Sequence, residues 1–566
     1  MTNLDRLQHE SVEVGAAPVV RTFLEQLKLE EILDASLPRK RLGRNAKLPT
    51  SRVIGVMITN ILNARRPLYG LREWARGFVP EPLGLDADQV ELLNDDRLGR
   101  ALEGMFEADR ASLMTAVITR AVKRFEIDVK QLHSDTTSVT FSGAYKKSSA
   151  HRSTKEPPPV ITFGHNKDHR PDLKQLVYAL TVSADGAVPI HHKTYDGNTT
   201  DDQVHIETWS TLRDIVGHPR FLYVADSKLC TRENLSYIVS HQGRFLTVLP
   251  RSRSEHATFC AMLRQGKLVE WEEVRRERDP RGAELPPIVY EAFEGDRSAE
   301  GHRILWYRSS QKMGLDANLR LAKIEKAKRR LEQLNERTRP FKSEEAARQA
   351  VQTILKEQQA ERWLHATVET HVGHDFKQTK PGRPNHKTRY RKEEIPFFVV
   401  DCRQNTDAIE EDARTDGVFP LITNVPDLSL KEALAKYKYQ PNLEKRNEQL
   451  KSVYHVRPVL LHNPKRVTGL LFVYFLALLL WALIEREIRR QMKRHNIKLL
   501  KLYPELRDCR APTTDGIFQA LNGVRRHRLL DDSGRPLKTF HDELSPVAEE
   551  CLRLLGVNLK PYGAPR

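Results

Sequence analysis

The stretch DVKQLHSDTTSVTF, residues 128–141, marks the point where the chain changes from a helical pattern to a strand pattern. From Val129 onward the pattern has a period of two, which is typical of a β-strand. This period places His133, Asp135 and Thr137 on one face of the strand. A carboxylate at a fixed position on a strand is suited to hold a hard cation, so Asp135 is the first candidate site residue.

Further strands are predicted after this stretch, and their order indicates the class of fold. The apolar runs with strand character are VITFG (160–164), LVYALTVSADGAVPIHHKTY (176–195), RFLYVAD (220–226) and RFLTVLP (244–250). The second run contains Asp185-Gly186, a strong hairpin signal, and a helix is expected to begin near Thr200. Three antiparallel strands followed by helix and strand in alternation is the order of a ribonuclease-H-like α/β core. We therefore expect a mixed five-stranded sheet with flanking helices.

Asp226 is the second candidate site residue because it ends the apolar run RFLYVAD. Its position predicts the carboxyl end of a buried strand, which is where α/β sheets place their ligands. In a ribonuclease-H-like core, the aspartates of the first and fourth strands meet at one edge of the sheet. The alternative is a turn residue or a helix cap, since Ser227 and Thr231 follow closely.

Glu444 is the third candidate and lies in the stretch YKYQPNLEKRNEQLK. Tyr437, Glu444 and Lys451 are spaced seven and seven, and seven residues are nearly two helical turns, so Glu444 and Lys451 share one stripe. Glu448 lies on the same stripe and is the fallback ligand. The alternative is an exposed helix with Glu/Lys pairs. Two aspartates on strands and a glutamate on a helix are the ligands needed to hold two divalent ions against a phosphodiester.

At 566 residues the chain is too long for one core, and we expect several domains. The expected regions are a helical N-terminal domain that is a candidate for binding DNA ends (1–126), the first part of the core (127–250), an insertion with strands, a helical hairpin and a basic linker (251–395), the second part of the core with the glutamate helix (396–490), and a C-terminal helical region (491–566). The hairpin is predicted from two charged helices, 316–338 and 343–365.

Charge and composition limit the kinds of partner that the protein is expected to bind. Lysine and arginine exceed aspartate and glutamate by 92 − 75 = 17, which favours a polyanionic partner such as nucleic acid. The five cysteines are scattered without metal-ligand spacing, and the first thirty residues contain no apolar signal segment. The uncharged run 469–484 is shorter than the roughly 20 residues of a membrane span, so we interpret it as a buried core helix. We expect a cytoplasmic protein with no membrane partner.

Two basic segments could contact DNA. PRKRLGRNAK (38–47) precedes a helix with apolar residues from Val53 to Ala64, which would suit either a helix-turn-helix grip on DNA or a plain helical scaffold. KQTKPGRPNHKTRYRK (377–392) contains Gly382-Arg383-Pro384, which resembles the minor-groove core of an AT-hook. For this second segment a solvated linker is the alternative.

Several motifs together carry a family resemblance. They are LNDDRLGRAL (93–102), LHSDTTSVTFSG (132–143), GHNKDHRPDLKQ (164–175), YDGNTTD (195–201), VADSKL (224–229), LITN (421–424) and ALIEREIR (482–489). With Tyr437, Glu444 and Lys451 in register, the chain resembles the bacterial insertion-sequence transposases of the DDE class, in the IS-four-like branch with a Tyr-x2-Arg-x3-Glu-x6-Lys signature. Where that signature has arginine, this chain has Gln440.

The resemblance implies a mechanism and partners. Asp135, Asp226 and Glu444 would be catalytic and would hold two Mg²⁺ or Mn²⁺ ions. Water would attack the phosphodiester at the transposon end, and the freed 3′-hydroxyl would then attack target DNA. Double-stranded DNA, as inverted-repeat ends and as target, would be bound by a homodimer near the nucleoid.

Further residues receive roles from the same resemblance. Tyr437 and Lys451 would position phosphates, and Lys438, Lys445 or Arg446 would replace the missing arginine. Trp306 is a candidate for stacking on a flipped base, with a core tryptophan as its alternative. Two other functions remain open: a structure-selective nuclease with the same core but no strand transfer, and a catalytically idle DNA-binding protein derived from a transposase.

Overall fold

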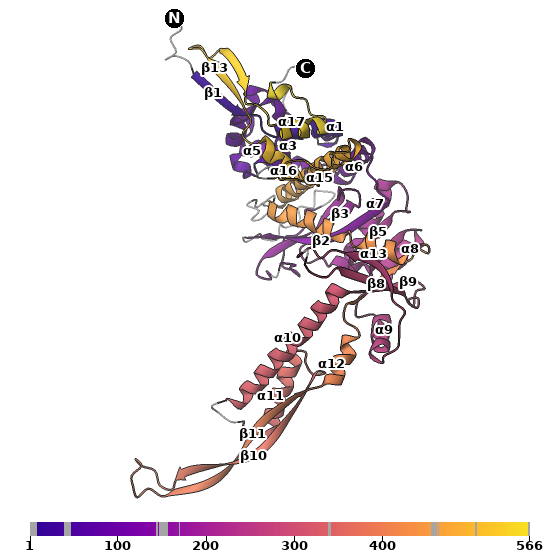
Figure 1. The fold of residues 1–566 in the computed structure, drawn as a ribbon. Helices are drawn as coiled ribbons and strands as arrows, with labels where there is room; N and C mark the ends of the chain where they lie inside the picture. Colours follow the sequence, from indigo (N-terminus) through magenta and orange to yellow (C-terminus); the bar gives the residue numbers. More distant parts are fainter. Residues whose placement is uncertain are drawn as a thin grey trace. The chain divides into compact units, whose positions relative to one another are not determined.

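The computed structural model describes residues 8–38, 47–142, 145, 157–168, 170–282, 284–337, 341–453, 461, 463–503 and 507–563. The chain has a mixed α/β fold and divides into two compact units (Figure 1). The first unit comprises Met1–Thr247 and Ala435–Arg566, and the second comprises Val248–Leu434. The second unit thus extends well beyond the predicted end of the insertion at residue 395.

The sheet of the first unit has its strands in the order β4-β3-β2-β5-β6. Its strands are β2 (Gln131–Phe141), β3 (Lys174–Ser183), β4 (Pro189–Tyr195), β5 (Leu222–Val224) and β6 (Arg244–Val248). Strands β2, β3 and β4 pair antiparallel, whereas β5 runs parallel to both β2 and β6. The predicted turn at Asp185-Gly186 joins β3 to β4, and Gly186 has the positive φ of 84° that such a turn requires. The predicted strand VITFG forms only a bridge between Thr162 and Gln175.

Helices surround this sheet and continue toward both ends of the first unit. They are α1 (Ala17–Leu27), α2 (Leu29–Ser36), α3 (Thr50–Asn63), α4 (Leu71–Arg76), α5 (Asp95–Glu107), α6 (Arg110–Phe125), α7 (His205–Val216), α8 (Arg232–Ser240), α14 (Gln440–Glu448), α15 (Pro464–Arg494), α16 (Thr514–Leu521) and α17 (Pro546–Leu555). The Asn94 side chain accepts a hydrogen bond from the Arg97 backbone N–H, so it caps α5 where the sequence predicts that helix to begin. The C-terminal region is not purely helical. Its strands β13 (Arg525–Leu530) and β14 (Pro536–His541) form a sheet with β1 (Gln8–Glu13), which joins the two ends of the chain.

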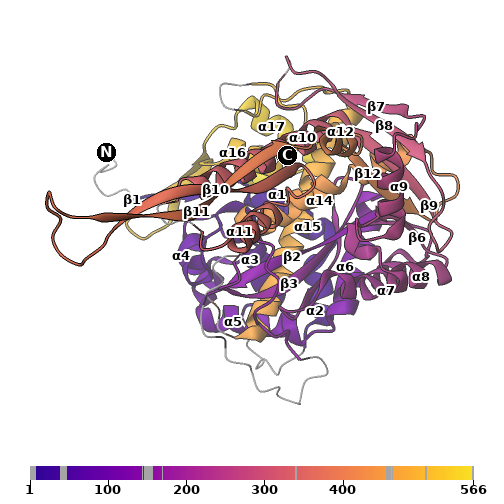
Figure 2. The ribbon, with the colours of Figure 1, turned by 90° about the horizontal axis from the view of Figure 1, so that it is seen from below.

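Helix α15 is the central element of the first unit. It lies between the N-terminal helices and the sheet (Figures 1 and 2) and contacts α3, α5, α17 and β4. In the described part of the chain, it alone is long and apolar enough to cross a membrane, and its apolar window is entirely buried. This agrees with its interpretation as a core helix.

The C-terminal half of α15 carries buried charges. Glu485 forms an ion pair of 2.8 Å with Arg446 of α14, and both side chains are only 8% exposed. The Trp481 indole donates to the other carboxylate oxygen of Glu485. Arg446 also donates to the backbone oxygens of Gly186 and Ala187 in the β3–β4 turn. A single arginine therefore connects α14, α15 and the sheet.

The second unit has an antiparallel sheet of order β12-β9-β8-β7, a helical hairpin and a separate two-stranded hairpin. Its elements are β7 (Glu272–Glu277), β8 (Ile288–Glu294), β9 (Arg303–Ser309), β10 (Leu364–Gln378), β11 (Tyr390–Gln404), β12 (Val418–Thr423), α9 (Ser254–Arg264), α10 (Ser310–Asn335), α11 (Glu344–Glu357) and α12 (Thr406–Ala413), with α13 (Leu430–Tyr437) leading back to the first unit. The predicted helical hairpin corresponds to α10 and α11, which pack against the base of the β10–β11 hairpin.

Removing one partner of the buried pair tests its role. Arg446→Met leaves the buried Glu485 carboxylate with only the longer 3.9 Å pair to Arg489, so we expect the free energy of unfolding of the first unit to fall by about 3 kcal/mol, the lower end of the range for a broken buried pair. Urea unfolding followed by circular dichroism measures this loss. The double variant Arg446→Met/Glu485→Leu removes both charges and should recover part of it. In the exposed pair Arg76–Glu91, Glu91→Gln should change little. Equal effects of Arg446→Met and Glu91→Gln would refute a structural role for the buried pair.

Candidate functional site

The parallel pairing of β2 with β5 brings the two predicted aspartates to the same level of the sheet. His133 pairs with Val224 in the register of these strands. Asp135 follows two residues later on β2, and Asp226 follows two residues after Val224, just beyond the end of β5. Neighbouring strands lie about 4.8 Å apart, so the two carboxylates come close together. Asp226 also accepts a hydrogen bond of 3.0 Å from the Lys228 backbone N–H, so it caps a short turn as well. The two interpretations of Asp226 given by the sequence are compatible.

The two aspartates repel each other in their ionised forms. Burial raises the pKa of Asp226, and the neighbouring charge of Asp135 raises it further. Asp201 adds a third negative charge to this environment. An excess of carboxylate oxygens at one edge of a sheet suits a hard divalent cation.

A lysine that the sequence did not single out lies among these carboxylates. The Lys167 ammonium is 3.3 Å from an Asp135 oxygen and 3.1 Å from an Asp201 oxygen, and it donates to the backbone oxygen of Thr136. Burial alone would lower the pKa of Lys167, but Asp135, Asp201 and Asp226 together raise it. Lys167 is therefore a fixed cation that partly offsets the negative charge.

Helix α14, which carries Glu444, docks on β2 through two amide side chains. The Asn447 amide donates to Asp135 at 3.2 Å, and the Gln440 oxygen lies 2.9 Å from Nδ1 of His133. Helical spacing puts Glu444 on the same face as these two residues. Its side chain is exposed and makes no direct contact with Asp135 or Asp226 in the described structure.

The third carboxylate does not complete a ligand set. Among the described residues, no group of three His, Cys, Asp or Glu side chains is close enough to hold one ion. Burial, and then the charges of Asp226 and Glu444, raise the pKa of the Tyr437 hydroxyl to about 12. Tyr437 therefore lies near both of these carboxylates. The two aspartates thus lie together, and Glu444 faces the same region through Tyr437.

Gln440, which stands where the resemblance leads one to expect an arginine, has an internal role in the structure. Burial lowers the pKa of His133 to about 4, so its ring is neutral at physiological pH. The Gln131 amide donates to Nε2 of that ring, which leaves Nδ1 to donate to the Gln440 oxygen. Gln440 is buried and serves this internal contact. An arginine guanidinium at position 440 has only donors, so it would face the Nδ1–H donor of His133 with no acceptor between them.

Of the other predicted contacts, those of Arg446 and Trp306 need correction. Arg446 is buried in the pair with Glu485, so it does not present its charge to a phosphate. Lys451 lies 3.0 Å from Asp168, and Lys445 is exposed. In the second unit, Trp306 is 2% exposed and stacks on Phe259 with 3.8 Å between ring centroids, which makes it a core residue and not a base-stacking one.

The N-terminal basic cluster falls mostly outside the described residues, since positions 39–46 are not among them. The helix that follows it, α3, is buried along nearly its whole length and contacts α1, α2, α5 and α15. It is a scaffold helix and has no free face for the major groove of DNA.

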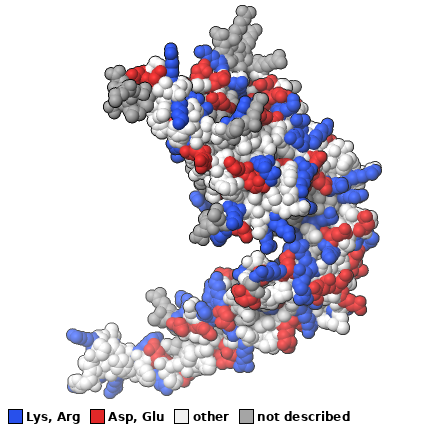
Figure 3. Space-filling model, turned by 45° about the horizontal axis from the view of Figure 1, so that its top comes forward, with Lys and Arg blue, Asp and Glu red and all other residues white. Residues whose placement is uncertain are grey.

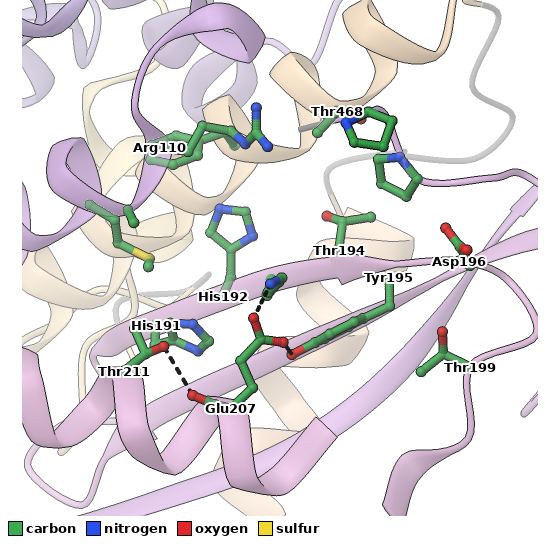
Figure 4. A pocket seen from close by; sticks show the side chains of 16 residues that line it. Arg110, His191, His192, Thr194, Tyr195, Asp196, Thr199, Glu207, Thr211 and Thr468 are labelled. Atoms are coloured by element: carbon green, nitrogen blue, oxygen red, sulfur yellow. Dashed lines mark hydrogen bonds and ion pairs between the residues drawn. The ribbon is translucent and has the colours of Figure 1, made fainter. Parts of the chain in front are cut away.

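A separate cavity of about 540 Å³ lies beside β4 (Figure 4). Residues of β4, α6, α7 and α15 line it, and none of the predicted site residues is among them. Burial lowers the pKa of His191 to about 3 and holds that of His192 well below its usual value, so both rings are neutral. The carboxylate of Glu207 is already engaged by Lys193 and Tyr195.

The raised pKa of Asp226 predicts a pH-dependent gain in stability for Asp226→Asn. A carboxyl with a raised folded pKa favours folding when protonated, and this contribution is lost as pH rises through the folded value. Without divalent cations at about pH 7, Asp226→Asn should therefore melt at a higher temperature than the wild type. The gain should shrink toward about pH 4.5 and on addition of Mg²⁺. The control is Asp88→Asn on the exposed turn Ala87–Leu92, which should show no such dependence. A lower melting temperature for Asp226→Asn at neutral pH would contradict the account.

An arginine at position 440 should destabilise the fold. Gln440→Arg removes the acceptor of the His133 Nδ1–H and buries a charge beside it, so we expect a loss of about 1–3 kcal/mol. Glu448→Arg introduces the same side chain at an exposed position of α14 and should cost little. Thermal unfolding of both variants measures the difference. Equal stability of Gln440→Arg and the wild type would mean that the His133 contact is dispensable.

The comparisons with known proteins add one match. Residues 9–119 match a family model described as a domain of unknown function (DUF4277). This range holds α1 to α5 and most of α6, and it ends before β2 and the candidate site. None of the curated proteins matches the chain.

Proposed function

We propose that this protein is a DNA transposase of an insertion sequence, with a ribonuclease-H-like catalytic core in its first unit. The observation that carries the proposal is the closeness of Asp135 on β2 and Asp226 just beyond the end of the parallel strand β5, with the glutamate helix docked against Asp135 through Asn447. The strand order β4-β3-β2-β5-β6, antiparallel and then parallel, supports the choice of core. The matched N-terminal domain occurs in transposase-like proteins.

Asp135, Asp226 and Glu444 would hold two Mg²⁺ or Mn²⁺ ions. The fit rests on the carboxylates of Asp135 and Asp201 beside Asp226: burial, and then these charges, raise the pKa of Asp226, and a divalent cation would neutralise the negative charge. When bound, such ions supply a nucleophilic water at neutral pH and stabilise the leaving oxygen of a phosphodiester. Glu444 is exposed on the face of α14 that carries Gln440 and Asn447, both of which contact β2, so it would be the ligand supplied by the helix.

The chain's own residues prepare the site for this chemistry. Asn447 donates to one oxygen of Asp135 and Lys167 contacts the other, so the carboxylate is held in one orientation. Lys451 and Tyr437 border the same region and suit the positioning of phosphates. The positive net charge of 17 supports double-stranded DNA as partner through counterion release.

Removal of each carboxylate tests the assignment. Asp135→Asn, Asp226→Asn and Glu444→Gln should each lower the rate of end cleavage by roughly 10²–10⁴-fold, because each loses several kcal/mol of cation-mediated stabilisation. Oligonucleotide duplexes that carry the element's terminal inverted repeats are the substrates, and cleaved and joined products are separated on a gel. Strand transfer should fall in parallel.

Glu448→Gln is the matched control, since Glu448 lies one turn beyond Glu444 on the same helix and is also exposed. Loss of activity in Glu448→Gln but not in Glu444→Gln would reassign the third ligand. Cleavage without joining in the wild type would instead identify a structure-selective nuclease. Binding of the duplex with neither reaction would identify an idle DNA-binding protein.

A further inference from the structure

The β10–β11 hairpin of the second unit is much longer than its packing requires. Its strands pair over fifteen residues each, from Leu364↔Gln404 to Gln378↔Tyr390, which corresponds to about 50 Å. Leu364 and Val400 at the base belong to the core formed with α10 and α11. Beyond Glu369 the hairpin leaves this core and extends past both helices (Figure 1).

The distal half of the hairpin has solvent on both faces. Large apolar side chains remain exposed there, with Val372 at 61%, Phe376 at 62% and Tyr390 at 50%. An isolated two-stranded ribbon buries no core of its own and is only marginally stable. A ribbon that keeps apolar side chains in solvent is typical of a surface that binds a partner.

The charge of the hairpin is concentrated at its end. Residues 377–392 contain seven lysines and arginines and no aspartate or glutamate. Glu393 pairs with Lys377 at 2.7 Å and with Arg391 at 3.0 Å, and these two cations lie just before the loop. Within the described ranges, Lys380, Arg383 and Lys387 have no acidic partner. Figure 3 shows Lys and Arg without Asp or Glu at the end of the hairpin, at its lower left.

The loop at the tip is stiff. Thr379 closes it through its backbone N–H and its hydroxyl, which both donate to the Arg389 backbone oxygen. Asn385 and Thr388 bond each other through side chain and backbone. Between these contacts lies Pro381-Gly382-Arg383-Pro384, in which the two prolines fix their own φ and Gly382 takes a φ of 151° that favours glycine. Arg383 is thus presented between two rigid apolar rings.

We propose that the tip of the β10–β11 hairpin inserts into the minor groove of A·T-rich double-stranded DNA. Arginine is attracted to a narrow minor groove, where the negative potential is enhanced, and proline can wedge between base steps and bend the duplex. The body of the ribbon carries Asp375, Glu393 and Glu394, which would face phosphates if the whole ribbon lay in the major groove. Only the tip is free of acidic side chains, so only the tip enters a groove.

This inference rests on the proposed function in taking DNA as the partner, but it has its own test. The full chain carrying Asp135→Asn is titrated with a fluorescent A·T-rich duplex that contains no inverted repeat, at several salt concentrations. The triple variant Lys380→Ala/Arg383→Ala/Lys387→Ala should lower the slope of log Kd against log salt by about 2–3, near 0.9 for each lost phosphate contact. The control Lys267→Ala/Arg278→Ala/Lys326→Ala removes three exposed cations of the same unit and should leave the slope unchanged.

The choice of groove is tested with base analogues. An inosine·cytosine duplex lacks the minor-groove amino group of guanine but keeps the major-groove edge of a G·C pair. We expect the wild-type chain to bind it as tightly as A·T DNA and several-fold more tightly than G·C DNA. Binding equal to that of G·C DNA would overturn minor-groove recognition.

Bending separates the role of the prolines from that of the charges. Energy transfer between dyes at the duplex ends should rise when the wild-type chain binds, and Pro381→Ala/Pro384→Ala should lose this rise with its salt slope retained. Equal salt slopes for the two triple variants would overturn the proposal even where end cleavage persists. Conversely, if the wild-type chain joins no DNA but the variant of Lys380, Arg383 and Lys387 still has the smaller salt slope, the transposase function is refuted and the proposal for the hairpin stands.

Discussion

The buried ion pair between Arg446 and Glu485 is the constraint on which the candidate site depends. Two charges taken out of water are stable only with good geometry and additional hydrogen bonds, and here the Trp481 indole and the Gly186 and Ala187 backbone oxygens supply them. Arg446 lies two residues after Glu444, which places it about 200° around the helix axis. Helix α14 is therefore fixed by one side and presents the other side toward β2.

That fixed helix faces a site with an unfavourable local charge. Asp135 on β2 and Asp226 just beyond the end of β5 repel each other, and burial also disfavours the charged form of Asp226. Lys167 offsets only part of it, because one ammonium is shared between Asp135 and Asp201. Proteins tolerate such instability where the function requires it, and the cost is met by packing elsewhere, here by the apolar length of α15.

The sequence predicted what depends on local pattern. The strand around Asp135, the turn at Asp185-Gly186 and the buried helix 469–484 all follow from periodicity and turn chemistry. It predicted, through the expected fold, that Asp135 and Asp226 come close together, but not the side chains from other segments that contact Asp135. Lys167 lies thirty-two positions from Asp135, and Asn447 lies more than three hundred positions away. Arg446 was misassigned because the pattern of a short, charged helix does not show that its far side meets a buried glutamate.

In the hairpin of the second unit, too, the local sequence pattern did not show the structure that the flanking segments impose. Residues 377–392 have the composition of a solvated linker, rich in lysine, arginine and proline. The strands on either side decide otherwise, because β10 and β11 pair in strict register up to Gln378 and Tyr390 and turn the basic segment into a closed loop. The apolar base of the hairpin is held by α10 and α11, whereas its tip is held only by its own prolines and turn bonds. A tip that is ordered but not buried loses conformational entropy on folding without gaining buried apolar area, which a simple connecting loop does not need. The same order lets Arg383 enter a narrow groove without a further loss of conformational entropy on binding.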